Sequence, residues 1–250
     1  MKYLGITPSK PRLAVFDFTC CEGCELQLTN NEDSLVDFLS LVDVVNFREA
    51  SSDRSDDYDI ALVEGAISRP DEIARLKKIR KNAKILVAFG TCAVYGGVNK
   101  LRNKYPVARV VKEVYGRHRV ETMKVRRISE VVKVDLEILG CPVSKKEVER
   151  IVVDLVTGAG VRLPKYPVCV ECKQNMNVCV MDQGRLCLGP ISRAGCGAPC
   201  PDGDACLGCR GPAPDANFAA YADILKKHGF PRDEIKEKLA FFGAFDGVKL

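Results

Sequence analysis

The stretch LAVFDFTCCEGC, residues 13–24, joins a continuous apolar run directly to three cysteines. Similar short runs, rich in Val, Ile, Leu and Phe, recur along the chain as VVNF (44–47), DIALVE (59–64), KILVAFG (84–90) and VDLEILG (134–140). Near-continuous apolar runs are typical of strands buried on both faces, as in a parallel sheet. Helical patterns separate them, at roughly 23–42, in PDEIARLKKIRKN (70–82) and in SKKEVERIVVDLVTG (144–158). This alternation predicts a doubly wound α/β domain.

Two of the predicted helices carry end signals. Pro70 begins one of them, with acidic residues in its first turn. Ser144 followed by Glu147 predicts a capping box at the start of the other, and Gly158 predicts its end.

The character of the chain changes after LPKYP (163–167), so we expect an α/β domain over 1–163 and a second domain over 164–250. Residues 169–209 hold eight cysteines with many glycines and prolines and almost no periodicity. Such a segment is not expected to build an apolar core, which predicts that an inorganic group holds it. The tail predicts two short helices, in DANFAAYADILKKHG and PRDEIKEKLAFF.

The composition limits the classes of function. The 250 residues include 13 cysteines and two histidines, with a net charge of +5. No apolar run approaches a membrane span and no signal peptide is evident, so we expect a cytoplasmic protein without membrane insertion. Thiols in that compartment are more often metal-binding or catalytic than disulfide-bonded. The densest basic stretch, 100–127, lacks a nucleic-acid reader fold, which favours a solvated or partner-covered segment.

Four cysteines share one expected location. Cys21 and Cys24 follow the first predicted strand, Cys92 follows the fourth and Cys141 the last. Since the carboxyl ends of parallel strands converge on one crevice, these four thiolates are expected to meet there. Glycines beside them allow close backbone approach, namely Gly23, Gly90 and Gly140, and Pro142 fixes the turn after the last cysteine. Zinc and an iron–sulfur cluster both suit four thiolates, and the wide separation of the ligands favours a cluster.

The other cysteines form two further groups of four. They run Cys169, Cys172, Cys179 and Cys187, then Cys196, Cys200, Cys206 and Cys209. Zinc remains the alternative, because two C-x2-C pairs are present, but they are further apart than in a zinc ribbon. The spacing favours iron–sulfur clusters and serial electron transfer, and one cysteine, Cys20, is left over.

These residues resemble the small, electron-transferring subunit of [NiFe]-hydrogenases over essentially the whole chain. The motifs that carry the resemblance are C-x-G-C (21–24), VEGAI (63–67), GTCA (90–93), LGCP (139–142), CVMDQGRLCLGP (179–190), RAGC (193–196) and ACLGCRGP (205–212). The resemblance implies a flavodoxin-like domain in which Cys21, Cys24, Cys92 and Cys141 hold the proximal [4Fe–4S] cluster. It implies a distal cluster on Cys169, Cys172, Cys179 and Cys187 and a medial cluster on Cys196, Cys200, Cys206 and Cys209.

Two departures from the periplasmic branch are informative. That branch has a histidine where this chain has Cys169 and a proline where it has Cys200, so three [4Fe–4S] clusters are implied here. The chain resembles the cytoplasmic branch, in particular the delta subunits of sulfhydrogenases and the small subunits of methanogen hydrogenases that do not reduce deazaflavin. The cysteine-rich second domain argues against the membrane-bound, energy-converting branch and against the related respiratory complex I subunit. The tandem Cys20-Cys21 of this chain nevertheless resembles an adjacent cysteine pair in that subunit, which leaves ligation by Cys20 open. Our preferred interpretation is that Cys20 is a spare thiol beside the cluster.

No nickel site and no dinucleotide fingerprint remain in the chain once these cysteines are assigned. We therefore expect a large NiFe subunit at the proximal cluster and a flavin- or ferredoxin-like subunit at the distal one, with no nucleic acid. A paralogous complex whose large subunit lacks nickel, or a zinc-stabilised scaffold, are the alternatives. Glu22, Glu25 and Glu64 lie beside the proximal motifs, with either a proton-transfer or a structural role. The apolar or small residues after Cys92 are expected at the large-subunit interface: Ala93, Val94, Tyr95 and Gly97.

Overall fold

The computed structural model describes residues 10–30, 34–200 and 203–248. The chain divides into two compact units, Met1–Arg162 and Leu163–Leu250, and each is described by itself. In these described residues no helix combines the length and the apolar character needed to cross a membrane.

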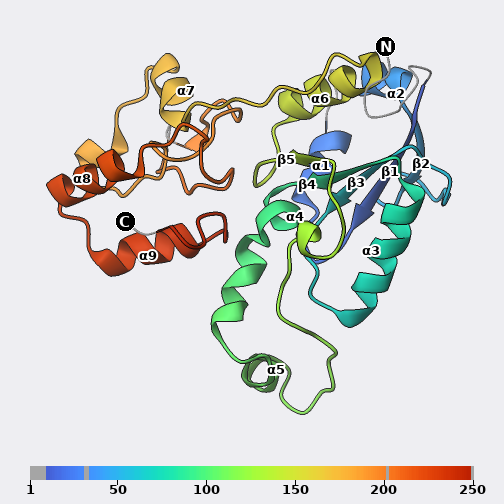
Figure 1. Ribbon diagram of the computed structural model, residues 1–250, viewed down its shortest axis with the longest axis horizontal. Helices are drawn as coiled ribbons and strands as arrows, with labels where there is room; N and C mark the ends of the chain where they lie inside the picture. The colour runs from blue at the N-terminus through green and yellow to red at the C-terminus, as the bar shows by residue number, and fades with distance from the viewer. Residues whose placement is uncertain (1–9, 31–33, 201–202, 249–250) are drawn as a thin grey trace. The chain divides into compact units, whose positions relative to one another are not determined.

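The first unit is built on a parallel sheet of five strands in the order β2-β1-β3-β4-β5 (Figure 1). The strands are β1 (Arg12–Asp17), β2 (Asp43–Phe47), β3 (Ile60–Glu64), β4 (Ile85–Phe89) and β5 (Leu136–Ile138). Every residue of β3 and β4 is buried, which is why their sequences are apolar rather than alternating, apart from Glu64 at the end of β3. All five predicted strands and the α/β fold class are confirmed.

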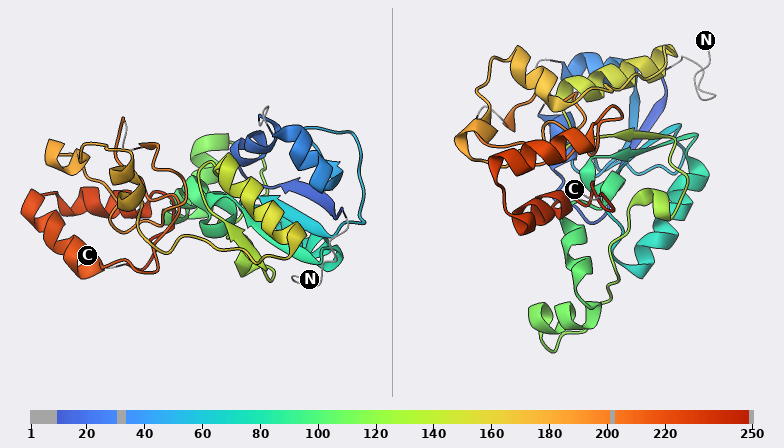
Figure 2. Two further views of the ribbon diagram at one scale, coloured as in Figure 1. Left: turned by 90° about the horizontal axis from the view of Figure 1, so that it is seen from above. Right: turned by 60° about the vertical axis from the view of Figure 1, so that its left-hand side comes forward.

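Helices cover both faces of this sheet. The helices of this unit are α1 (Gly23–Thr29), α2 (Leu35–Leu41), α3 (Pro70–Asn82), α4 (Thr91–Tyr95), α5 (Val107–Tyr115) and α6 (Lys145–Thr157), with 3-10 helices η1 (Gly97–Lys104) and η2 (Ile128–Glu130). Leu76 and Ile79 of α3 share a core with Ala14 and Phe16 of β1 on one face. The opposite face is covered by α1, α2 and α6, which lie together in both views (Figures 1 and 2).

The helical pattern predicted over 23–42 forms two helices instead of one. The first, α1, ends at Thr29, and the second, α2, begins at Leu35; residues 31–33 between them lie outside the described residues. The polar run NNEDS (30–34) explains the interruption, because Asn, Asp and Ser side chains compete with helical backbone hydrogen bonds.

Of the predicted helix-end signals, those at Pro70 and Gly158 are confirmed and the one at Ser144 is not. Pro70 begins α3, and Glu72 in its first turn accepts hydrogen bonds from the backbone N–H groups of Ser68 (2.7 Å) and Arg69 (3.0 Å). The capping box predicted at Ser144 is wrong, because its side chain makes no capping hydrogen bond. Gly158 ends α6 in the left-handed conformation, as predicted.

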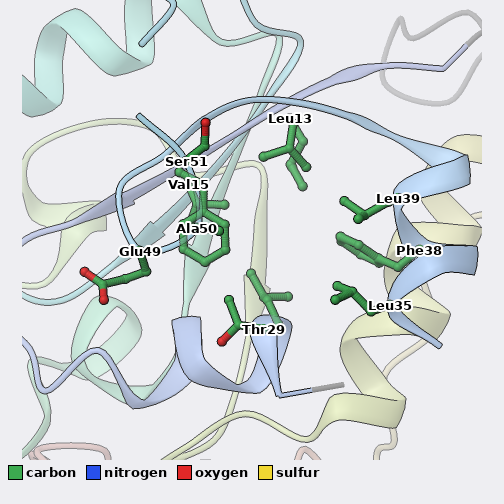
Figure 3. A pocket seen from close by; sticks show the side chains of 12 residues that line it. Leu13, Val15, Thr29, Leu35, Phe38, Leu39, Glu49, Ala50 and Ser51 are labelled. Carbon is green, nitrogen blue, oxygen red and sulfur yellow. The ribbon is translucent and has the colours of Figure 1, made fainter. Parts of the chain in front are cut away.

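A cavity of about 430 Å³ lies between the sheet and the helices of the second face (Figure 3). Leu35, Phe38 and Leu39 of α2 point toward Leu13 and Val15 of β1 across it. The packing of this face therefore leaves space beside apolar side chains.

The segment between α4 and β5 leaves the sheet and returns to it. Figure 1 shows α5 well away from the sheet, and the right-hand view of Figure 2 agrees. The return is held by backbone hydrogen bonds between Ile67 and Arg126 (2.8 and 2.9 Å). We call residues 100–127 the basic arm.

The second unit contains α7 (Val168–Gln174), the 3-10 helix η3 (Val180–Gln183), α8 (Phe218–His228) and α9 (Arg232–Ala240). The two tail helices are confirmed. The expectation that 169–209 builds no apolar core is wrong, because side chains at irregular spacing are buried with residues from the tail helices. They are Val180, Met181, Leu186, Leu188, Ile191, Tyr221, Leu225 and Leu239. Irregular spacing hides this core from a periodicity analysis.

Candidate metal centres

The first candidate centre lies at the carboxyl edge of the sheet. Cys24 is in α1 after β1, Cys92 is in α4 directly after β4, and Cys141 follows β5. Cys24 is buried, whereas Cys21 and Cys141 are exposed at the surface of the chain. The parallel order of the strands thus brings residues from positions 21–141 to one edge.

Glycines pack directly against two of these thiols. A Cβ atom at Gly90 would collide with Sγ of Cys24, and one at Gly97 would lie 2.6 Å from Sγ of Cys92. Both glycines have positive φ angles, 88° and 60°. Side chains at these positions would displace the sulfur atoms, so the glycines are needed for the geometry of the site.

The thiols influence one another electrostatically. Burial, the nearby thiols of Cys141 and Cys21, and Glu64 raise the pKa of the Cys92 thiol to about 12. Burial and Glu64 also raise the pKa of Cys24, to which Cys141 contributes. These thiols hold their protons at neutral pH, and binding a metal must therefore release protons.

Three glutamates near the first centre have different environments. Glu64 accepts hydrogen bonds from the backbone N–H groups of Cys24 (3.2 Å) and Glu25 (2.9 Å), which ties β3 to the start of α1. Glu22 pairs with Arg48. Both carboxyl oxygens of Glu25 are buried without a hydrogen-bond partner, and burial followed by Glu64 raises its pKa to about 8. Glu64 and Glu22 thus have structural contacts.

Cys20 is oriented differently from its neighbours. Its thiol donates to the carbonyl of Phe18 at 3.5 Å, and burial raises its pKa to about 12. The thiol charges that raise the pKa of Cys92 come from Cys141 and Cys21. The electrostatic contacts thus join Cys21 to the other cysteines of the edge.

The interface expected after Cys92 is corrected by the structure. Val94 is 2% exposed and packs in the core with Ala88 of β4 and Leu139. Ala93 and Gly97 are also buried, because α4 packs onto the end of the sheet. Val94 is therefore a core residue, and its substitution would disturb the fold before any interface.

The second candidate centre is a small cavity in the second unit. Its lining includes the four cysteines of one predicted group, Cys169, Cys172, Cys179 and Cys187, together with Val180, Met181 and Gly189. Burial and the thiols of Cys187, Cys172 and Cys179 raise the pKa of Cys169 to about 12. A Cβ at Gly189 would lie 3.3 Å from Sγ of Cys187 and 3.4 Å from Sγ of Cys169. The cavity thus combines four sulfur donors with apolar walls.

In the third predicted group, Cys196, Cys200, Cys206 and Cys209, nearby thiols affect the pKa values of Cys196 and Cys206. Cys200 contributes to the raised pKa of Cys196, whose main cause is burial. Burial also raises the pKa of Cys206, to which Cys187 and then Cys209 contribute. Cys206 also donates its backbone N–H to Sγ of Cys187 at 3.3 Å, which connects this group to the second centre. Residues 201–202, next to Cys200, lie outside the described residues.

Two polar contacts at these centres were not found from the sequence. Asn99 Nδ2 donates to Sγ of Cys92 at 3.7 Å. The Glu171 carboxylate accepts from the backbone N–H groups of Gly195 (2.7 Å) and Gly197 (2.9 Å), on either side of Cys196. Neither residue stands at a recognisable motif spacing, so the sequence holds no signal for them.

The donor set suits soft metal chemistry. Thiolates favour zinc and iron–sulfur clusters over hard cations. Within the ranges that the structure describes, no three His, Cys, Asp or Glu side chains are arranged to hold one metal ion. The cavity lined by four cysteines is the observation that fits a thiolate-bound group.

An open parallel sheet with cysteines at its carboxyl edge, followed by a second unit with a cysteine-lined cavity, defines a class of cysteine-rich α/β proteins with candidate thiolate centres. The family model for NADH ubiquinone oxidoreductase, 20 Kd subunit, matches residues 21–155. Sulfhydrogenase 2 subunit delta of Pyrococcus furiosus is 37% identical over 236 residues, which cover 92% of this chain and 98% of that protein. The chain belongs to this family of hydrogenase small subunits and related oxidoreductase subunits.

Two further similarities agree with this family. A vhu subunit of the F420-non-reducing hydrogenase from Methanocaldococcus jannaschii is 31% identical over 90% of this chain and 91% of that protein. A chain in the crystal structure of an NAD+-reducing [NiFe]-hydrogenase in the H2-reduced state has a TM-score of 0.57 at 27% identity, covering 62% of this chain and 96% of that chain. The resemblance to hydrogenase small subunits is confirmed, and the matches to the first two relatives extend well beyond residues 21–155.

Proposed function

We propose that the chain is the electron-transfer subunit of a [NiFe]-hydrogenase complex and carries electrons through three [4Fe–4S] clusters. The cavity lined by Cys169, Cys172, Cys179 and Cys187 is the single observation that carries the proposal furthest. Family membership supports an oxidoreductase role, and the names of the relatives include hydrogenases.

The ligands are proposed as three groups in two domains. Within residues 1–163, the proximal cluster is held by Cys21, Cys24, Cys92 and Cys141. Within 164–250, the distal cluster is held by Cys169, Cys172, Cys179 and Cys187, and the medial cluster by Cys196, Cys200, Cys206 and Cys209. The electrostatic contacts among the thiols of the first two groups, and between Cys196 and Cys200, support this division, whereas Cys206 is affected by Cys187 as well as by Cys209.

When bound, each cluster supplies reversible one-electron transfer. The chain's own residues hold the thiolates, exclude water and direct hydrogen bonds at sulfur. The backbone N–H groups of Gly189 and Cys206 lie 3.4 and 3.3 Å from Sγ of Cys187. Such donors stabilise negative charge on the thiolate and so raise the potential of a group bound there.

The predicted sites of the chain include neither a nickel site nor a dinucleotide fingerprint, and we propose that partner subunits supply these functions. A large catalytic subunit with the NiFe site is proposed at the proximal edge, and a flavin- or ferredoxin-like subunit at the distal centre. Each partner contributes the redox centre that receives or donates the electron.

Metal analysis of anaerobically purified protein tests the proposal. We expect about twelve iron and twelve acid-labile sulfide per chain, since each group of four thiolates suits one cubane. Low-temperature electron paramagnetic resonance of the reduced protein is expected to show interacting [4Fe–4S] signals. About eight iron would mean that one group is misassigned, and a colourless protein with stoichiometric zinc would reject electron transfer.

A further inference from the structure

The basic arm has a charge that distinguishes it from the rest of the chain. Residues 100–127 contain ten lysine and arginine side chains and two glutamates, whereas the whole chain has a net charge of only +5. The remainder of the chain is therefore slightly acidic. A charge concentrated on one projecting segment creates a local positive field that attracts an acidic surface.

The tip of the arm also exposes apolar and aromatic side chains. Helix α5 buries none of its nine residues. Val114 and Tyr115 in it are 67% and 46% exposed, and Tyr105 before it is 52% exposed. Exposed tyrosines among arginines are typical of protein–protein contacts, in which Tyr and Arg are enriched. Residues 100–127 show no recognisable nucleic-acid reader fold, and contacts to phosphate give no reason for the exposed Val114.

The base of the arm is fixed by hydrogen bonds. The side chain of Asn103 donates to the carbonyl of Val125 and accepts from its N–H, both at 2.8 Å. The backbone N–H of Met123 donates to the carbonyl of Ser68 at 2.8 Å. These bonds pre-organise the segment and lower the entropic cost of binding through it.

The position of the base indicates which partner the arm meets. Asn99, just before the arm, donates to Sγ of Cys92 (3.7 Å) and to the carbonyl of Thr19 (3.1 Å). The arm therefore starts at the proposed proximal centre, at the edge that a catalytic partner must cover. Since Val94 is buried, the exposed apolar surface after Cys92 is supplied by Val98 and by the arm itself.

We propose that the basic arm is a docking element for the catalytic subunit and binds an acidic surface of that subunit with an apolar strip for α5. This inference rests on the proposed function for the identity of the partner. It adds the contact surface, its charge and its residues.

Charge reversal at the tip tests the proposal in the intact complex. Arg117 and Arg119 are exposed, so Arg117→Glu with Arg119→Glu is expected to preserve the fold. Lys77→Glu with Lys81→Glu, on the exposed side of α3, is the matched control with the same change in charge. The co-expressed complexes are purified anaerobically, and their dissociation constants are measured by native mass spectrometry and size exclusion at increasing salt.

We expect the arm variant to bind the catalytic subunit roughly ten- to a hundredfold more weakly at low salt, from two exposed contacts that become repulsive. The difference should shrink near 1 M salt, where the Debye length is about 3 Å. Val114→Asn, at an exposed position, removes an apolar contact without changing the charge and should weaken the complex at all salt concentrations.

The outcomes separate the two proposals. If the arm variant binds the catalytic subunit as tightly as the control does, the docking proposal is wrong. It is also wrong if the arm variant loses only co-purifying nucleic acid, or only the electron-accepting subunit, and keeps the catalytic subunit. Iron content is measured on the same samples. An iron-free wild-type chain that still binds the catalytic subunit through the arm rejects the electron-transfer function and leaves the docking element standing.

Discussion

Glu171 connects two of the proposed cluster sites, and its removal gives a quantitative prediction. The residue lies in α7 between Cys169 and Cys172. Its carboxylate accepts two backbone hydrogen bonds, from Gly195 at 2.7 Å and Gly197 at 2.9 Å, and these flank Cys196. The contact holds α7, with its two proposed distal ligands, against the loop with the proposed medial ligand Cys196.

The magnitude follows from the two bonds that Glu171→Ala removes. Hydrogen bonds to a charged group contribute about 1.5–3 kcal/mol each, and we use the lower value because Glu171 is half-buried. The loss is then about 3 kcal/mol of local stability in the loop around Cys196. Since 1.4 kcal/mol corresponds to a factor of ten, the loop should open about a hundredfold more often. Glu171→Gln keeps one carbonyl acceptor and should show about half of this free-energy loss.

The assay is the rate at which an iron chelator removes iron from the anaerobic protein. For Glu171→Ala we expect about one third of the iron to leave about a hundredfold faster than from the wild-type protein, and the rest to leave at the wild-type rate. Glu237→Ala removes an exposed carboxylate from α9 and serves as the control. Release of all the iron at the wild-type rate would show that the Glu171 contact does not stabilise the loop around Cys196. Simultaneous fast release of all the iron would show that its effect is not confined to that loop.

Three further predictions concern the cysteines, the cavity and the second unit. Cys20→Ser should keep the iron content and Cys24→Ser should lose about one third of it; the reverse result would assign the ligand to Cys20. Val15→Ile adds a methyl group beside the cavity and should raise the free energy of unfolding by up to about 0.8 kcal/mol. The apparent melting temperature should then be about 2–3 °C higher. A lower melting temperature would mean that the space is already filled. After oxidation and chelation, limited proteolysis should cut first within 169–209, because ligand binding adds to the stability of that segment, and earlier cleavage within 13–90 would contradict this.

Much of the fold could be predicted because its signals are local. The runs that became β3 and β4 are apolar except for Glu64 at the end of β3, since both faces of these strands are buried. Pro70 marked the start of α3, since its missing N–H costs nothing there. The edge positions of Cys92 and Cys141 followed from the strands before them, because parallel strands end at the same side of a sheet.

Other features depended on contacts between residues far apart in the chain. Val94 has the composition of an interface residue, and only its packing against Ala88 and Leu139 identified it as core. Ser144 and Glu147 have the spacing of a capping box, yet the Ser144 side chain makes no capping bond. A spacing shows that a bond is geometrically possible, whereas the surrounding packing determines which bond forms.

The sequence by itself determined the order of strands and helices along the chain, the thiols that are proposed as metal donors, and the family. Only the tertiary structure decided that 169–209 shares a buried core with the tail helices, that Glu171 reaches the loop of Cys196, and that the basic arm exposes α5. The physical reason is the range of the interactions. Periodicity and end signals act within a few residues, while burial and side-chain contacts depend on where the folded backbone brings distant residues together.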